Sequence, residues 1–224
     1  MKQCGTFSRG SSSANRMIHV PIPDVEINMI KRLFDIFFSL AGIILLSPLL
    51  LLVALLVKLD SKGPVFFRQE RIGLGFKPFR IYKFRTMVAD AFLNGPLVTS
   101  VVDRRITRVG RFLRRTKIDE LPQLLNVLKG DMSLVGPRPE VAKFVELFID
   151  DYREVLEVRP GITDFAALEY CDEEDALKKY ADPEEGYIRE ILPAKIRLYK
   201  KYLRERGLIT DIKLIILTIT RITK

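Results

Sequence analysis

Residues 36–57 read IFFSLAGIILLSPLLLLVALLV, an apolar run of 22 residues without a charged side chain. A straight helix of this length measures about 33 Å, which is enough to cross the hydrocarbon core of a bilayer. The run lacks the small-residue cleavage pattern of a removable signal peptide. It is also longer than the core helix of a soluble domain needs to be. The sequence therefore predicts a membrane helix.

Ser47-Pro48 interrupts this run near its middle. Proline removes a backbone donor and bends a helix, and a serine hydroxyl can bond to the carbonyl that the proline leaves free. Two interpretations follow, a kinked span and a re-entrant helix that breaks at Ser47-Pro48 and returns to the side from which it entered. Basic residues flank both ends, at Lys31-Arg32 and at Lys58, as expected if both ends stay cytoplasmic. The residues alone favour neither.

Positive charge follows the apolar run directly. The chain carries a net charge of +9, and residues 58–118 hold 15 Lys/Arg against 4 Asp/Glu, a net of +11. Such a block is typical of proteins that bind anionic lipid headgroups, phosphorylated substrates or nucleic acid. The single histidine, His19, argues against histidine triads and two-histidine zinc sites. The two cysteines, Cys4 and Cys171, stand far apart and predict neither a disulfide nor a thiolate metal site.

Within this block the pattern predicts a small β-hairpin and a basic helix. Residues 65–67 and 79–84 are rich in aromatic and branched side chains, and Gly73, Gly75 and Pro78 lie between them. Lys83 and Arg85 would project from one face of the second strand. Residues 102–115 have the periodicity of an amphipathic helix that could rest on a membrane surface. An ordinary surface helix is the alternative.

An adjacent carboxylate pair, Asp119-Glu120, follows the last cations of the block. Leucines at 121, 124, 125 and 128 recur at helical spacing, Pro122 suits a first turn, and Gly130 stops the helix. The pair would therefore lie at a helix N-terminus, where ionised carboxylates are favoured. Such groups serve as nucleophiles or metal ligands. The alternative is that Asp119 is only the N-cap, a frequent position for aspartate.

Two arginines in proline-rich turns follow this helix. In Gly136-Pro137-Arg138-Pro139-Glu140 the prolines hold Arg138 on a stiff backbone, which suits phosphate recognition or a plain rigid linker. Arg159 opens a second such turn, Arg159-Pro160-Gly161-Ile162-Thr163. The sequence further predicts helices over 140–157 and 193–206, an acidic loop or short helix over 171–186, and a last apolar stripe over 208–219 that lies on a membrane or packs on the core.

The expected fold is α+β and mostly helical, with amphipathic membrane-surface helices around a small domain. The predicted parts are a mobile N-terminal tail over residues 1–29, a membrane helix over residues 30–58 and a membrane-associated domain over residues 59–224.

Six motifs in order carry a resemblance to a known family. They are Lys31-Arg32-Leu33-Phe34-Asp35 before the run broken at Ser47-Pro48, 82–87 (YKFRTM), 119–124 (DELPQL), 126–133 (NVLKGDMS), 136–140 (GPRPE) and 159–163 (RPGIT). In this combination the chain resembles the bacterial sugar transferases, monotopic phosphoglycosyl transferases that begin glycoconjugate and exopolysaccharide assembly. The resemblance covers residues 30–224. It implies that residues 30–58 form a re-entrant membrane helix broken at Ser47-Pro48 and that residues 59–224 form a cytoplasmic, membrane-associated catalytic domain.

The resemblance implies transfer of a sugar phosphate from a UDP-sugar to polyprenyl (undecaprenyl) phosphate, with Mg²⁺ and with release of UMP. It assigns Asp119 as the nucleophile that forms an aspartyl-phosphosugar, and Glu120 as a Mg²⁺ ligand with Asp119 beside it. Phosphates would be bound by Arg138 between Pro137 and Pro139, with Arg159, Lys83, Arg85 and Arg114 as further candidates. The enzyme would lie on the cytoplasmic face of the bacterial inner membrane, in contact with lipid, and a homodimer is left open.

The chain departs from the family pattern in one region, which would contact the sugar. Many relatives follow the second turn with Gly-Trp-Ala-Gln and Asn-Gly-Arg, where this chain has 164–170, DFAALEY, and then an acidic segment. That region would shape the sugar pocket, so the sugar is not predicted. A membrane-tethered module that binds anionic lipid or nucleic acid without catalysis is the alternative function, although the chain has no recognisable nucleic-acid motif and no Trp. A second alternative is a single-span scaffold protein in which Asp119 only caps a helix.

Overall fold

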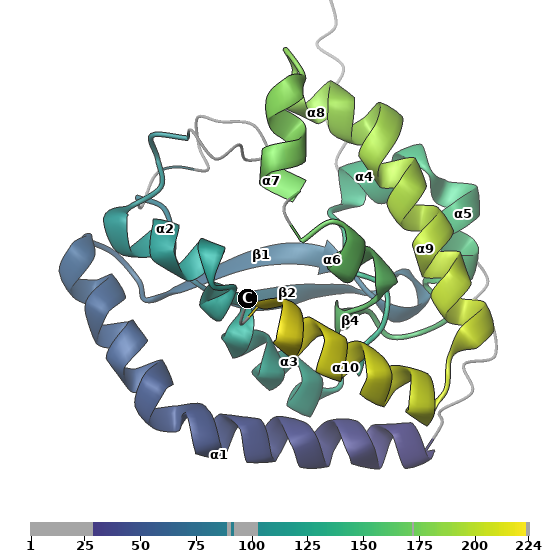
Figure 1. Ribbon diagram of the computed structural model, residues 1–224, viewed down its shortest axis with the longest axis horizontal. Helices are drawn as coiled ribbons and strands as arrows, with labels where there is room; N and C mark the ends of the chain where they lie inside the picture. Colours follow the sequence, from purple (N-terminus) through teal and green to yellow (C-terminus); the bar gives the residue numbers. More distant parts are fainter. Residues whose placement is uncertain (1–28, 89–90, 92–102, 172, 223–224) are drawn as a thin grey trace, which may run out of the picture.

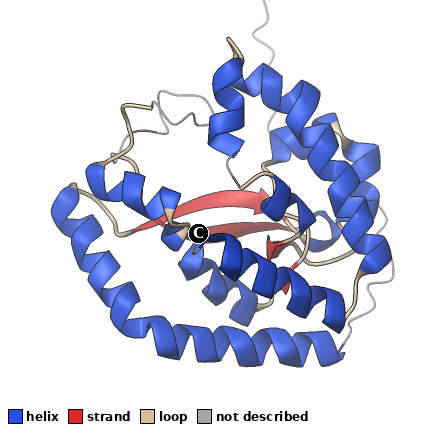
Figure 2. Ribbon diagram, viewed as in Figure 1, coloured by secondary structure: helices blue, strands red, loops and turns tan. Residues whose placement is uncertain are grey.

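The computed structural model describes residues 29–88, 91, 103–171 and 173–222. Helices wrap around two small sheets (Figures 1 and 2). The principal elements in chain order are α1 (Met29–Asp60), β1 (Phe66–Ile72), β2 (Pro78–Phe84), α2 (Arg108–Arg115), α3 (Leu124–Lys129), β3 (Ser133–Val135), α4 (Ala142–Leu147), α5 (Ile149–Val155), β4 (Gly161–Thr163), α6 (Phe165–Glu169), α7 (Glu173–Ala176), α8 (Pro183–Gly186), α9 (Leu192–Glu205) and α10 (Leu208–Ile222). Single 3-10 or π-helical turns join them: η1 (Leu74–Phe76), η2 (Ile118–Gln123), η3 (Leu177–Lys179) and η4 (Tyr187–Ile191). The mostly helical α+β prediction is confirmed.

Helix α1 runs along one edge of the molecule and then bends around it (Figure 1). Pro48 lies inside the helix, and the Ser47 Oγ donates to the Ile44 carbonyl at 2.8 Å. This is the carbonyl, four residues back, that a donor at position 48 would otherwise satisfy. The predicted break is therefore a bend in a continuous helix. The predicted tail lies outside the described residues, except that Met29 already begins α1.

Both arms of α1 are attached to the globular part. Near its start, the Lys31 ammonium lies 2.5 Å from the buried carboxylate of Asp211 in α10. Near its end, Val53 and Val57 pack with Phe84 and Leu113 in one buried cluster. The helix is thus part of the core and does not stand apart from it.

The predicted hairpin is confirmed. Strands β1 and β2 are antiparallel, with Phe66 opposite Phe84 and Ile72 opposite Pro78. A second pair, β3 with β4, is parallel and was not predicted, because each strand has only three residues. It brings the two proline-rich turns together: a Cβ on Gly161 would lie 2.0 Å from the Gly136 nitrogen, so this contact requires glycine.

Three helix predictions are corrected in detail. Helix α2 begins at Arg108 and not at residue 102, because the Thr107 hydroxyl accepts from the Gly110 amide and caps it there. The helix predicted over 140–157 is two helices, α4 and α5, since the backbone at Phe148 leaves helical geometry (φ −124°, ψ 39°). In α3 the leucine stripe is only partly buried, and Asn126 and Val127 are the fully buried residues. Asn126 is inside because its amide bonds to the backbone of β2 at Arg80 and Tyr82.

The main core lies between α4, α5, α9 and the turns before α9 (Figure 1). Helix α9 confirms the helix predicted over 193–206. In α10, Asp211 and Leu214 are buried, whereas the apolar stripe predicted from the sequence is mostly exposed: Ile209 is 85% exposed and Ile219 58%.

Candidate active site

Asp119 and Glu120 lie on the 3-10 helix η2, which connects α2 to α3. The turn begins at Lys117, a non-glycine residue with φ 55°, and Pro122 occurs within it. The N-cap position belongs to Lys117, and no side chain caps the turn. The alternative reading of Asp119 as a helix N-cap is therefore wrong, because its carboxylate does not cap the turn.

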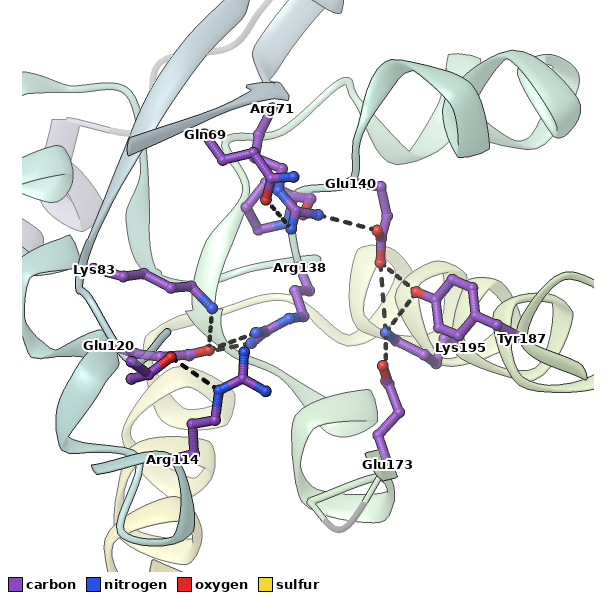
Figure 3. A network of polar contacts seen from close by, with 12 residues as sticks. Gln69, Arg71, Lys83, Arg114, Glu120, Arg138, Glu140, Glu173, Tyr187 and Lys195 are labelled. Atoms are coloured by element: carbon purple, nitrogen blue, oxygen red, sulfur yellow. Dashed lines mark hydrogen bonds and ion pairs between the residues drawn. The ribbon is translucent and has the colours of Figure 1, made fainter. Parts of the chain in front are cut away.

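Glu120 is bound by two cations from other elements (Figure 3). Its Oε1 lies 2.6 Å from the Lys83 ammonium of β2 and 2.5 Å from Arg138 Nη2. A second bond, 3.2 Å long, joins Arg138 Nη1 to Oε2. Burial alone would raise the pKa of Glu120, but the charges of Arg138 and Lys83 hold it well below its ordinary value. Burial in turn lowers the pKa of Lys83, against the effect of Glu120.

Asp119 has the opposite surroundings. Its side chain is 6% exposed, and Oδ1 has no hydrogen-bond partner among the described residues. Burial raises its pKa to about 6, against the attraction of Lys83 and with the help of the neighbouring Glu120 charge. At neutral pH Asp119 is thus an ionised, poorly solvated carboxylate with one uncommitted oxygen. Such an oxygen is suited to nucleophilic attack or to cation binding.

The pair fits a Mg²⁺ ion in its donor chemistry. Mg²⁺ takes oxygen ligands, usually from one or two carboxylates together with substrate phosphates and water. Asp119 and Glu120 supply two adjacent carboxylates, and the unpartnered Oδ1 of Asp119 is a donor atom with no other protein partner in the described chain. No larger cluster of His, Cys, Asp and Glu occurs among those residues. Any such ion would therefore complete its ligand shell with phosphate and water oxygens.

The remaining predicted site residues divide into two groups. Pro137 and Pro139 are buried and hold Arg138 toward Glu120. The side chain of Arg114 lies near the carboxylate pair (Figure 3), with Nε donating to Thr86 Oγ1 at 2.9 Å. The structure therefore brings Lys83, Arg114 and Arg138 together around Asp119 and Glu120.

Arg85 and Arg159 are placed away from the carboxylate pair, so their contact with a substrate phosphate stays a prediction. Strand β2 ends at Phe84, so Arg85 does not share a face with Lys83. Its guanidinium is bound instead to the carboxyl end of α1, at the Val57, Ser61 and Lys62 carbonyls. The Arg159 Nε donates to the Gly130 carbonyl at 2.9 Å, beyond the end of α3. No contact joins either arginine to the carboxylate pair within the described residues, and both instead satisfy backbone carbonyls.

Comparison with known proteins decides the family. A family model described as "Bacterial sugar transferase" matches residues 27–224. The chain belongs to the bacterial sugar transferase family. The resemblance inferred from the six motifs is thereby confirmed.

Three curated relatives of the chain are informative. The chain is 47% identical over 152 residues to a UDP-N-acetylgalactosamine-undecaprenyl-phosphate N-acetylgalactosaminephosphotransferase of Aeromonas hydrophila, covering 66% of this chain and 36% of the relative. It is 50% identical over 119 residues to a putative undecaprenyl-phosphate N-acetylgalactosaminyl 1-phosphate transferase of Bacillus subtilis, covering 53% and 66%. It is 39% identical over 210 residues to the UDP-glucose:undecaprenyl-phosphate glucose-1-phosphate transferase of Escherichia coli, covering 89% and 42%. The chain thus spans between about a third and two thirds of these relatives.

In the described part of the chain, α1 is the one helix that is long and apolar enough to cross a membrane. Some cations of the basic block have partners within the protein. Lys83 and Arg85 are bound as described above, Arg71 pairs with Glu140, and Arg105 pairs with Asp103. Most of the other cations of the block are exposed, so the binding of an anionic partner by this block stays a prediction.

Sequence reasoning missed a second polar cluster next to Arg138. It consists of Arg71, Glu140, Glu173, Tyr187 and Lys195 (Figure 3). One signal was available: Lys195 falls on the buried stripe of α9, between Leu192 and Tyr199. A lysine within an apolar stripe indicates a buried, paired charge.

Proposed function

We propose that this sugar transferase moves a sugar-1-phosphate from a UDP-sugar to undecaprenyl phosphate or a similar polyprenyl phosphate, and releases UMP. The relatives named above act on undecaprenyl phosphate by name, and two of them name a UDP-sugar as well. The observation that carries the proposal for this chain is the carboxylate pair. One member is neutralised by two cations, and the other is buried with an uncommitted oxygen.

In the proposed reaction Asp119 is the nucleophile. An oxygen of its carboxylate attacks the β-phosphorus of the UDP-sugar, and the bond from that phosphorus to the bridging oxygen breaks, so that UMP leaves with the electron pair. A phosphate oxygen of the polyprenyl phosphate then attacks the same phosphorus and releases Asp119. The products are polyprenyl-diphosphate-sugar and a regenerated carboxylate. Both displacements reuse one site.

The cations around the pair support this assignment, because phosphoryl transfer depends on positioning and on neutralising charge. Lys83 and Arg138 already bind an anion, Glu120, and can share their donors with a substrate phosphate. Arg114 lies near the pair as a third cation. Mg²⁺ bound by Asp119 and Glu120 would supply further neutralisation of the diphosphate charge.

We further propose that α1 enters one leaflet and returns, with the globular part on the cytoplasmic face of the inner membrane. Both arms of α1 contact the same globular part, through Lys31 at one end and through Val57, which packs there and accepts from Arg85, at the other. A helix that crossed the bilayer would place its ends on opposite sides. The apolar surface of α1 between these contacts is exposed, with Leu45 79% and Leu51 72% exposed. It lies where lipid would cover it.

The reaction is tested by UMP release from a panel of UDP-sugars. Detergent-purified protein is assayed with undecaprenyl phosphate and Mg²⁺, and wild type is compared with Asp119→Asn. We expect release with one or two sugars and loss of release in the variant, because an amide is not a nucleophile. Release that survives in Asp119→Asn would leave a transferase but remove the covalent mechanism. No release with any sugar, under conditions where an E. coli relative is active, would reject the proposed function.

The helix topology is tested by cysteine labelling in a chain in which Cys4 and Cys171 are replaced by Ser. Cysteines at Met29, which is 65% exposed, and at the exposed Lys62 should react with an impermeant maleimide from the same side of inverted vesicles. A cysteine at Leu45, near the bend, is the control and should be protected. Labelling of positions 29 and 62 from opposite sides would exclude the re-entrant helix and leave a full span.

A further inference from the structure

A buried ionic cluster lies beside the Arg138 turn and has no part in the chemistry proposed above (Figure 3). Its centre is Glu140, 4% exposed, and Lys195, 2% exposed. The Glu140 Oε1 accepts from the Tyr187 hydroxyl at 2.6 Å and lies 3.4 Å from the Lys195 Nζ. Lys195 also donates to Tyr187 at 3.0 Å and to Glu173 at 2.8 Å. Buried charges of this kind are costly unless each is paired, and here each is.

The cluster is attached directly to the turn that carries Arg138. Glu140 follows Pro139, and its Oε2 lies 3.3 Å from Arg71, which also donates to the Pro139 carbonyl at 3.2 Å. The Glu140 carbonyl accepts from the Ile72 amide of β1 at 2.9 Å. Prolines fix φ on both sides of Arg138, so the backbone of this turn has little freedom to adjust. A shift of Glu140 would therefore also move the Arg138 guanidinium. The position of Arg138 therefore depends on how Glu140 is held.

Lys195 also pairs with Glu173, a carboxylate that would otherwise compete with Glu120 for Arg138. After Glu120, the negative charges of Glu173 and Glu140 contribute most to raising the pKa of Arg138, so both carboxylates act on this guanidinium. Lys195 takes the Glu173 carboxylate into an ion pair. Without the ammonium, Glu173 would be free to turn toward Arg138 and draw it away from Glu120. Such a change would alter the charge presented to substrate.

We propose that Lys195 is a positioning residue for Arg138: by pairing with Glu140 and Glu173 from α9, it holds the Pro137–Pro139 turn so that Arg138 faces Glu120 and the substrate phosphates. The inference rests on the proposed function. It adds to that function a residue far from Asp119 in sequence, whose side chain bonds to Glu140, Glu173 and Tyr187 and not to the carboxylate pair.

A double-mutant cycle tests it. Lys195→Met, Lys195→Arg and Arg138→Ala are made singly, and Lys195→Met is combined with Arg138→Ala. For each we measure kcat and KM for UMP release, together with the melting temperature. We expect Lys195→Met to lower kcat/KM by about tenfold or more, and Lys195→Arg to restore most of it. In the Arg138→Ala background Lys195→Met should cost less than about threefold, because the residue through which it acts is gone.

Lys200→Met is the matched control, since Lys200 is on the same helix but pairs at the surface with Asp151 and Glu154. It should leave kcat/KM unchanged. Equal losses from Lys195→Met in both backgrounds, or a lower melting temperature with unchanged kcat/KM, would overturn the proposal and leave Lys195 as a core ion pair. If Lys195→Met does not fold, Lys195→Gln, which keeps a polar side chain among Glu140, Glu173 and Tyr187 but carries no charge, takes its place in the cycle.

Hydrogen exchange separates this inference from the proposed reaction. If wild type releases no UMP, the reaction is rejected, and the positioning role is judged by the backbone amides of Gly136, Arg138 and Glu140. These amides should exchange faster in Lys195→Met than in wild type, while the β1–β2 hairpin amides away from Ile72 keep their rates. Unchanged exchange at the three amides would overturn the positioning role by itself.

Discussion

Asp119 and Glu120 are adjacent in sequence, yet their surroundings separate their acidities. Glu120 receives two cations, and its pKa is held well below the ordinary value. Asp119 is buried with few partners, and its pKa is raised to about 6. When two titratable neighbours are pushed apart in this way, they take different roles. Glu120 stays charged at every working pH, whereas Asp119 is the member whose charge state can be changed.

This difference predicts a pH-dependent gain in stability for Asp119→Asn. Raising a carboxyl pKa from 3.8 to about 6 corresponds to about 3 kcal/mol. The sign follows from proton linkage: the folded state binds this proton more tightly than the unfolded state, so ionised Asp119 destabilises the fold fully above pH 6 and not at all below both pKa values. In urea unfolding, Asp119→Asn should be more stable than wild type by up to about 3 kcal/mol at pH 7.5.

The gain should shrink by more than half at pH 4.5. Asp150→Asn is the control, because the Asp150 side chain is 87% exposed and lies at a surface ion pair. It should show no such gain at either pH. An equal gain for Asp119→Asn at both pH values would mean that charge burial is not its cause.

Candidate site residues could be predicted where they stand in a recognisable local pattern, and those defined by packing were missed. Glu120 and Arg138 stand in short motifs, and the structure pairs their side chains. Arg85 and Arg159 stand in equally clear motifs but bind backbone carbonyls, which sequence spacing does not reveal. Side chains with several donors serve either role, and only the fold decides which.

At the scale of elements, α1 is the clearest success of sequence reasoning. The Ser47-Pro48 pattern predicted both the bend and the hydroxyl that satisfies the freed carbonyl. Helices α2 and α4–α5 were predicted as helical segments but with the wrong limits. The Thr107 cap and the non-helical Phe148 depend on contacts that periodicity does not register. The same holds for β3 and β4, which have too few residues to show an alternating pattern.

Ser47→Ala should destabilise the protein by about 1 kcal/mol or more, because the Ile44 carbonyl would lose its hydrogen bond in an apolar environment. Ser39→Ala is the matched control on the same helix. Its hydroxyl is fully buried and has no partner among the described residues, so its removal should be neutral or stabilising. The two variants are compared by thermal unfolding in detergent. A similar loss in both would point to helix packing and not to the carbonyl.

At the scale of the whole molecule, α1 is joined to the globular part by ion pairs and hydrogen bonds. Lys31 pairs with the buried Asp211, Arg32 donates to the Val127 and Leu128 carbonyls of α3, and Asp35 accepts from the Leu134 amide. The sequence could not predict these links, since they join residues about a hundred or more positions apart.

A chain that begins at residue 61 should therefore fail to fold, even in detergent. It would expose the buried cluster around Phe84 and Leu113 and leave Asp211 without its cation. We expect loss of the cooperative thermal transition in circular dichroism, with the full chain in the same detergent as control. A truncated chain with a sharp transition and native-like exchange protection would show that α1 is a dispensable anchor.

The attachment of α1 at both ends also bears on the membranes in which the protein can work. A spanning helix has to match the thickness of its bilayer, and it tilts or distorts the lipid when it does not. Here the protein itself fixes the distance between the helix ends, and the bend at Pro48 fixes how far the apolar surface projects. If α1 returns to the face from which it enters, as we propose, it has no far interface to reach, and its fit does not depend on bilayer thickness. The same chain is then equally suited to thin and thick bilayers and experiences no mismatch that would sort it between them.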